Sequence, residues 1–158
     1  MNAEIEIRTA LGNDWPAAIY AAKVRTQRTR SLHIDVPQRE NEANIQYTLL
    51  GIELKVGKRR FACPDLATAR YMRVFARIGV RDSAVPYNIT KISVIADELE
   101  TAWQRVSLLA SEMSKDLEPT AAKRLRGRII KALRSEFIEI GAGEAMPTFD
   151  QKASTRRA

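Results

Sequence analysis

The chain has 158 residues, of which 45% are hydrophobic and 28% are charged, so it can supply a buried core and is not a wholly disordered protein. Its 26 Lys and Arg against 19 Asp and Glu give a net charge of +7, which attracts polyanions such as nucleic acid. A single cysteine excludes an internal disulfide, and the apolar runs are too short to cross a membrane. Because no apolar leader opens the chain, we expect a cytoplasmic protein.

Short elements of both kinds are predicted at the start of the chain. Alternation of Ile with charged residues over 4–8 predicts a strand. Asp14 is expected to cap a helix over 15–28, with a proline in its first turn. Residues 32–36 are a second predicted strand, whereas 38–50 fit a short helix and a strand equally well.

A β-hairpin and a helix are predicted next. Residues 52–56 alternate strictly between apolar and polar side chains, 57–58 supply a tight turn, and 59–63 form the returning strand. The segment 66–78 lies between a capping aspartate and a glycine, which predicts a helix. A further strand is predicted over 83–87, and its proline indicates a position at a sheet edge.

The C-terminal part of the chain, 89–141, is predicted to form an antiparallel helical hairpin. Apolar residues recur at three- and four-residue steps over 90–115, and again along one side of a second helix over 119–140. Residues 142–158 have no periodicity, so we expect a disordered tail. The predicted fold class is α+β, in which the hairpin packs on a small α/β portion over 1–88 as one compact domain.

The strongest functional pattern lies in the second helix of this hairpin. Residues 123–134 hold six cations and no acid, and helical geometry places five of them within an arc of about 140° opposite the apolar side. These five are Lys123, Arg124, Arg128, Lys131 and Arg134. Such a stripe can follow a phosphate backbone, and Gly127 would allow a phosphate to come close. The alternative is a solvated face that pairs with Asp97, Glu98 and Glu100 of the preceding helix.

Two other basic clusters repeat this pattern. Arg70, Arg73 and Arg77 fall on one narrow stripe of the predicted helix over 66–78, and we expect them to share an exposed face. The third cluster lies at 23–30. No aromatic residue interleaves the stripes and no base-reading motif is present, so contact with the backbone of DNA or RNA is expected. The leading hypothesis is a non-enzymatic nucleic-acid-associated protein, acting alone or as a small subunit of a nucleoprotein complex.

A second pattern combines Asp35 with Glu53 and Lys55. A carboxylate on one strand and a Glu-x-Lys on the next can hold Mg²⁺ at a phosphodiester while the lysine assists the attacking water. The arrangement resembles the PD-(D/E)xK nucleases over about 31–88, and this resemblance implies a magnesium-dependent nuclease. It departs from the family in that Pro37 follows the aspartate. The alternative is that Glu53 and Lys55 are the solvent face of a hairpin.

A third hypothesis is a protein-interaction module. The heptad-like stripe from Ile92 to Met113 would then form a homodimer or dock on an acidic protein partner. No cofactor is expected outside the nuclease alternative, and no membrane partner. The one histidine, His33, is expected to be a partly buried structural side chain, and the sequence has no His/Cys metal motif or phosphate-binding loop.

Overall fold

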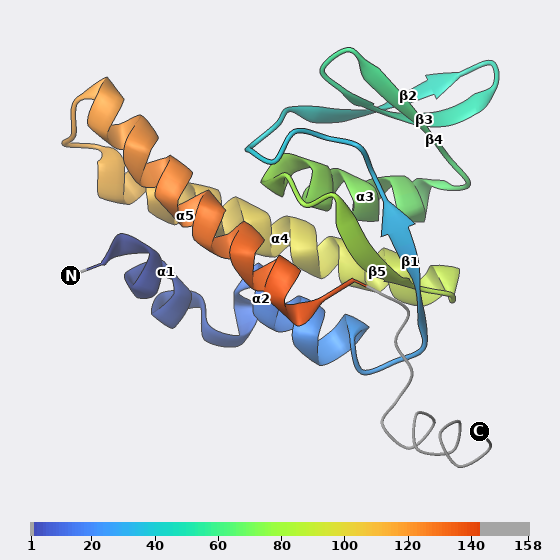
Figure 1. The fold of residues 1–158 in the computed structure, drawn as a ribbon, viewed down its shortest axis with the longest axis horizontal. Coiled ribbons are helices and arrows are strands. Elements are labelled where there is room, and N and C mark those ends of the chain that lie inside the picture. The colour runs from blue at the N-terminus through green and yellow to red at the C-terminus, as the bar shows by residue number, and fades with distance from the viewer. Residues whose placement is uncertain (1, 143–158) are drawn as a thin grey trace.

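Two long antiparallel helices run through the middle of the molecule (Figure 1). The computed structural model describes residues 2–142. Helix α4 (Ile89–Ser114) and helix α5 (Pro119–Ile140) form the pair. Helix α3 (Leu66–Ile78) packs on one side of them and carries a small sheet, and the N-terminal helices pack on the other side. This arrangement confirms the predicted α+β fold class and the helical hairpin.

The N-terminal segment is a helix, so the strand predicted over 4–8 is wrong. Helix α1 (Ala3–Leu11) begins after Asn2, whose side chain accepts a hydrogen bond from a backbone N–H of the first turn. Ile7 is buried against α4 and α5, whereas Ile5 is exposed. In a strand these two side chains would share one face. The apolar alternation therefore marks no buried face, because packing against α4 and α5 covers only the Ile7 side of this helix.

A broken helical segment follows α1. It consists of a 3₁₀ turn η1 (Gly12–Asp14), helix α2 (Pro16–Ile19) and a π-helical turn η2 (Tyr20–Val24). The proline lies in the first turn as predicted, but Trp15 occupies the cap position and Asp14 does not cap. The helix also ends at residue 24, four residues before the predicted end at 28.

Strands β1 (Thr29–His33) and β5 (Asp82–Pro86) form a two-stranded antiparallel sheet. Strand β1 begins three residues before the strand predicted over 32–36. The apolar signal there comes from Ile34 and Val36, which are buried beyond the end of β1 beneath the second sheet. At this point of the chain the residues that pair as a strand are therefore not the ones that gave the apolar signal.

The second sheet is an antiparallel meander. Strands β2 (Ala43–Thr48), β3 (Gly51–Val56) and β4 (Arg59–Cys63) are hydrogen-bonded in that order, which confirms the predicted hairpin and places a strand within the ambiguous segment. One face of the meander covers α3 through Leu54 and its neighbours on the sheet. The other face is polar and turns away from the core.

Helix α3 begins and ends as predicted. The Asp65 side chain accepts a hydrogen bond of 2.7 Å from the Thr68 N–H, and Gly79 ends the helix with a left-handed φ of +88°. A side chain at position 79 would also place its Cβ 2.3 Å from the main-chain oxygen of Arg39. Glycine is therefore required here twice, by the backbone angle and by the adjacent loop.

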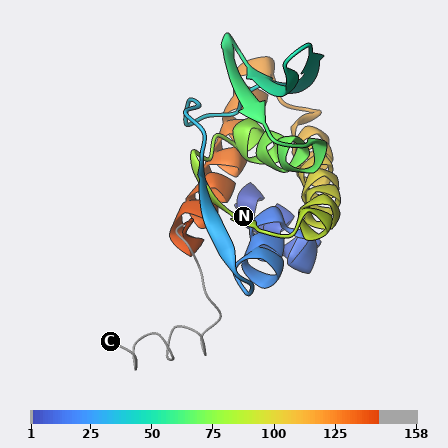
Figure 2. The same cartoon turned by 90° about the vertical axis from the view of Figure 1, so that its right-hand side faces the viewer.

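Three aromatic rings meet at the centre of the core. Tyr20 of η2 lies edge-on to Phe75 of α3 at 5.6 Å and to Phe137 of α5 at 5.0 Å, and the two phenylalanines are 5.2 Å apart. Tyr71 adds a fourth ring, 4.9 Å from Phe75. Figure 2 shows the elements that carry these rings, together with α4, around one interior, which a single apolar cluster fills.

Two buried hydroxyl groups close the free edge of β5. The Tyr20 hydroxyl accepts a 2.9 Å hydrogen bond from the Ala84 N–H and donates one of 2.7 Å to the main-chain oxygen of Gly141. The Tyr71 hydroxyl donates to the Ala84 oxygen at 2.6 Å. Burial raises the pKa of both hydroxyls, so both stay protonated and able to donate. Side chains thus satisfy backbone groups that a third strand would otherwise bind.

The inward faces of α4 and α5 are apolar along their whole length. Their buried members from the predicted seam are Ile92, Ile95, Leu99, Ala102, Trp103, Val106, Leu125, Ile129, Leu133 and Phe137. They belong to the same cluster as residues of the N-terminal segment and α3. Among the described residues, no helix is both long and apolar enough to cross a membrane. Apart from residue 142, the predicted tail lies outside the described residues.

The seam can be tested with two leucines of α4. Leu99 is fully buried, whereas Leu108 is 70% exposed. We expect Leu99→Ala to lower the free energy of unfolding by about 2–5 kcal/mol, because it removes buried methyl groups and leaves a cavity. Leu108→Ala should change it by no more than about 0.5 kcal/mol. Urea denaturation measures both, and equal effects of the two changes would contradict the burial of the seam.

The hydroxyl of Tyr20 can be tested in the same way. Tyr20→Phe keeps the ring but leaves the Ala84 N–H and the Gly141 oxygen without this partner, so we expect a loss of about 1–3 kcal/mol of unfolding free energy. Tyr47 is 71% exposed, and Tyr47→Phe is the matched control with an expected change below about 0.5 kcal/mol. A neutral Tyr20→Phe would show that water replaces the hydroxyl at no cost.

Candidate nucleic-acid interface

The outward face of α5 carries four exposed cations. They are Lys123, Arg124, Arg128 and Lys131. The rotation of the helix is fixed because Leu125, Ile129 and Leu133 are buried on its other side. At 3.6 residues per turn, the four cations then point away from the core. In Figure 2 the helix lies at the margin of the molecule, so this face is directed to solvent. We call these four residues the α5 basic face.

No carboxylate in the described part of the chain forms an ion pair with the α5 basic face. The acids of α4 that were alternative partners bind other cations. Asp97 and Glu100 contact Arg70, and Glu98 contacts Lys23. The charge of the α5 basic face is therefore not neutralised from within the described chain.

Gly127 lies in the middle of the α5 basic face. It is exposed, and a Cβ built at this position would meet nothing within 4 Å outside its own helix backbone. No side chain therefore covers the helix backbone at Gly127, between Arg124 and Arg128. A glycine destabilises an exposed helix by about 1 kcal/mol relative to alanine, and no packing contact requires a glycine here. The missing side chain leaves room for a phosphate close to the helix backbone.

Two other arginines of α5 hold the helix in place. Arg134, the fifth predicted member of the stripe, donates from Nε to the main-chain oxygen of Ile78 at 3.0 Å, and its burial lowers its pKa. Arg126 binds both carboxylate oxygens of Glu40, at 2.8 and 2.7 Å, and lies over the Trp103 ring at 5.9 Å. Both arginines contact other parts of the chain. Arg134 is therefore not part of the exposed face.

The arginines of α3 do not form an exposed stripe, and that prediction is wrong. Arg70 binds Asp97 and Glu100, and Arg73 binds Glu100 at 3.2 Å. The side chains of Arg70 and Arg73 are only 23% and 21% exposed. The reason is that α4 packs along the polar side of α3. The apolar side of α3 faces the main core, and the meander covers the helix at Met72 and Ala76. A helix that is amphipathic in sequence is here covered on several sides.

Arg77 and the cluster at 23–30 are also engaged in contacts within the chain. Arg77 donates to the main-chain oxygen of Ala43 at 3.2 Å, and burial lowers its pKa. In the cluster at 23–30, Lys23 forms an ion pair with Glu98. Of the three predicted basic surfaces, the α5 basic face is the one that keeps most of its cations exposed and unpaired within the described residues.

The structure does not bring the three residues of the nuclease pattern together. Glu53 and Lys55 do share one face of β3, the polar face that turns away from the core. Asp35 lies beyond β1 and binds Arg59, which pairs with Val56 on the core-facing side of the meander. The sheet therefore separates Asp35 from the other two. Among the described residues, no group of three or more His, Cys, Asp or Glu could hold a metal ion.

Two further sequence interpretations change with the structure. The stripe from Ile92 to Met113 packs against the chain's own core, which removes the observation that supported a docking role. His33, expected to be partly buried, is exposed on β1 and contacts Asp82 of β5 at 2.6 Å. In both cases the elements that pack against the residue determine its surroundings, and the local sequence does not show which elements these are.

The ion pairs between α3 and α4 predict a stability effect. Glu100→Gln removes the charge that faces Arg70 and Arg73, and we expect a loss of about 1–3 kcal/mol of unfolding free energy. The control is Glu112→Gln, whose partner Lys115 is exposed, with an expected change below about 0.5 kcal/mol. Chemical denaturation compares them. A Glu100→Gln variant as stable as the parent would show that these ion pairs contribute nothing to stability.

Comparison with protein-family models, with curated proteins and with solved structures finds no match to this chain. Function is therefore inferred from the side chains themselves. The α5 basic face offers four cations on the outward side of a helix whose position is fixed by its buried residues. Such a surface is complementary to an extended polyanion.

Proposed function

We propose that this protein binds the phosphate backbone of nucleic acid through the α5 basic face. The observation that supports the proposal is that four cations share one exposed face and have no carboxylate partner among the described residues. From Lys123 to Lys131 they extend over about 12 Å of helix axis, since a helix rises about 1.5 Å per residue. That length covers about three successive phosphates of one strand.

Contact with the backbone is favoured over recognition of bases. Helix α5 contains no Asn or Gln, so its exposed face lacks the side chains that pair with adenine edges. Its cations can contact phosphates of any sequence. Phosphate contacts fix position and affinity but carry no sequence information. The same chemistry serves DNA and RNA, in a protein acting alone or as a small subunit of a nucleoprotein complex.

Charge removal on α5 tests the proposal. Changing Arg124, Arg128 and Lys131 together to Gln should weaken binding to unrelated sequences by similar factors. The slope of log affinity against log salt should fall by up to about three units, roughly one for each lost phosphate contact. Fluorescence anisotropy with two labelled nucleic acids, between about 50 and 200 mM salt, measures this. Unfolding free energy should change by less than about 0.5 kcal/mol per site, because these side chains are exposed.

A matched control removes the same charge elsewhere. The control changes Lys55 of β3, Lys58 of the following turn and Arg60 of β4 together to Gln. This change also lowers the net charge by three. We expect this control to keep most of the affinity and the salt slope. Equal losses in the two triple variants would show dependence on net charge alone. Unaltered affinity in the α5 variant, or no binding by the parent at low salt, would contradict the proposal.

A further inference from the structure

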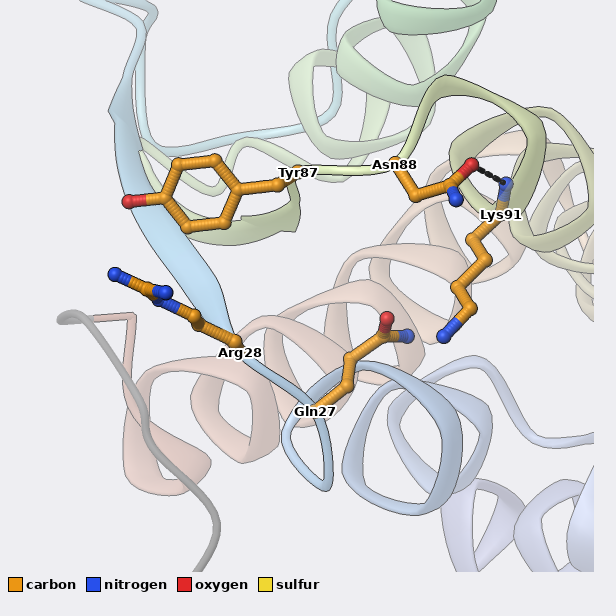
Figure 3. A pocket seen from close by; sticks show the side chains of 5 residues that line it. All are labelled: Gln27, Arg28, Tyr87, Asn88 and Lys91. Atoms are coloured by element: carbon orange, nitrogen blue, oxygen red, sulfur yellow. Dashed lines mark hydrogen bonds between the residues drawn. The ribbon is translucent and has the colours of Figure 1, made fainter. Parts of the chain in front are cut away.

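A second group of cations lines a pocket between the end of η2 and the start of α4 (Figure 3). The pocket has a volume of about 380 Å³. Its lining residues are Gln27, Arg28, Tyr87, Asn88 and Lys91. Gln27 and Arg28 precede β1, Tyr87 and Asn88 join β5 to α4, and Lys91 lies in the first turn of α4. The pocket therefore depends on the pairing of β1 with β5. Its size is in the range of small-ligand sites.

Among the described residues, the lining of this pocket carries two cations and no carboxylate. Three other pockets of comparable volume include acids, such as Glu40 and Glu42 or Asp97. Because no described residue of the lining is acidic, the cations Arg28 and Lys91 attract an anion into this pocket. The attraction comes from side chains and does not depend on the helix terminus, whose first amides already donate to the Asn88 side chain.

Arg28 is preorganised for an oxyanion such as phosphate. Its guanidinium group lies over the Tyr87 ring, with the carbon of the group 5.5 Å from the ring centre. Stacking of this kind leaves the N–H edges of the guanidinium free to donate to phosphate oxygens. Lys91 approaches from the other side of the pocket in Figure 3. Tyr87 is 54% exposed, so part of its ring remains accessible to a second planar group.

We propose that this pocket binds a nucleotide, with the phosphate between Arg28 and Lys91 and the base against the Tyr87 ring. Two cations alone would accept any anion, and an exposed aromatic ring alone would accept any planar group. A nucleotide carries both within one small volume. The ligand is a free nucleotide or the terminal nucleotide of a strand. This site goes beyond the proposed function, because a free nucleotide needs no contact with α5.

Binding of AMP to the full chain, measured by isothermal titration calorimetry, tests the site. Adenosine lacks the phosphate and inorganic phosphate lacks the ring, so each should bind at least about tenfold more weakly than AMP. Arg28→Gln and Lys91→Gln should each lower the AMP affinity about tenfold, because each removes a charged hydrogen-bond donor to phosphate. Tyr87→Leu should weaken AMP binding more than it weakens binding of inorganic phosphate, because it removes the contact with the base as well as the support for Arg28.

Control variants separate this site from general charge and from α5. Lys58→Gln removes an exposed cation in a distant turn and should not alter AMP binding. The α5 triple variant should likewise bind AMP as the parent does. Its nucleic-acid affinity therefore tests the α5 basic face, and its AMP affinity separately tests this pocket. Thermal denaturation of each variant confirms folding. Equal losses with Lys58→Gln would overturn the proposal.

Oligonucleotides then distinguish the two sources of the nucleotide. A 5′-phosphorylated strand that competes with AMP, while the same strand with a 5′-hydroxyl does not, assigns the pocket to strand ends. Binding of AMP without such competition assigns it to a free nucleotide. Absence of AMP binding by the parent overturns the proposal. Phosphate bound as tightly as AMP, with no effect of Tyr87→Leu, also overturns it, because the site would then recognise an anion and not a nucleotide.

Discussion

The side chain of Tyr20 joins three parts of the molecule that are far apart in the sequence. Its ring packs on Phe75 and Phe137, and its hydroxyl binds backbone groups of Ala84 and Gly141. A buried hydroxyl needs hydrogen-bond partners and a buried ring needs close neighbours, so Tyr20 restricts how η2, α3, β5 and α5 pack together. Its contacts with Phe137 and Gly141, together with the buried residues of α5, fix the rotation of that helix and the direction of its cations.

Arginine has two roles in this protein, and neighbouring elements decide between them. At boundaries between elements, Arg70, Arg126 and Arg134 bind carboxylates or a main-chain oxygen and are partly covered. The planar guanidinium suits such positions because it can donate several hydrogen bonds from one half-buried group. Where no acid of the described residues lies nearby, as on α5 and around Arg28, the same charge stays open to a ligand.

Part of each candidate site is present in the sequence. Helical periodicity places Lys123, Arg124, Arg128 and Lys131 on the side opposite the apolar residues, and the structure keeps all four exposed. Periodicity does not show that Arg134, at the margin of the same arc, lies against the end of α3. Arg28 belongs to the predicted basic cluster at 23–30, but the sequence does not indicate the pocket, because Arg28 and Lys91 come together only through the pairing of β1 with β5.

The sequence by itself determined the elements whose signals are local. The caps Asp65 and Gly79 set the ends of α3, strict alternation marked β3, and the apolar steps of α4 and α5 defined the hairpin. The tertiary structure decided whether 4–8 became helix or strand, where β1 begins, and which polar stripe remained in solvent. The physical reason is that spacing along a chain fixes which side chains share a face. Exposure of that face depends on the element that packs against it, and this contact is made by residues distant in the sequence.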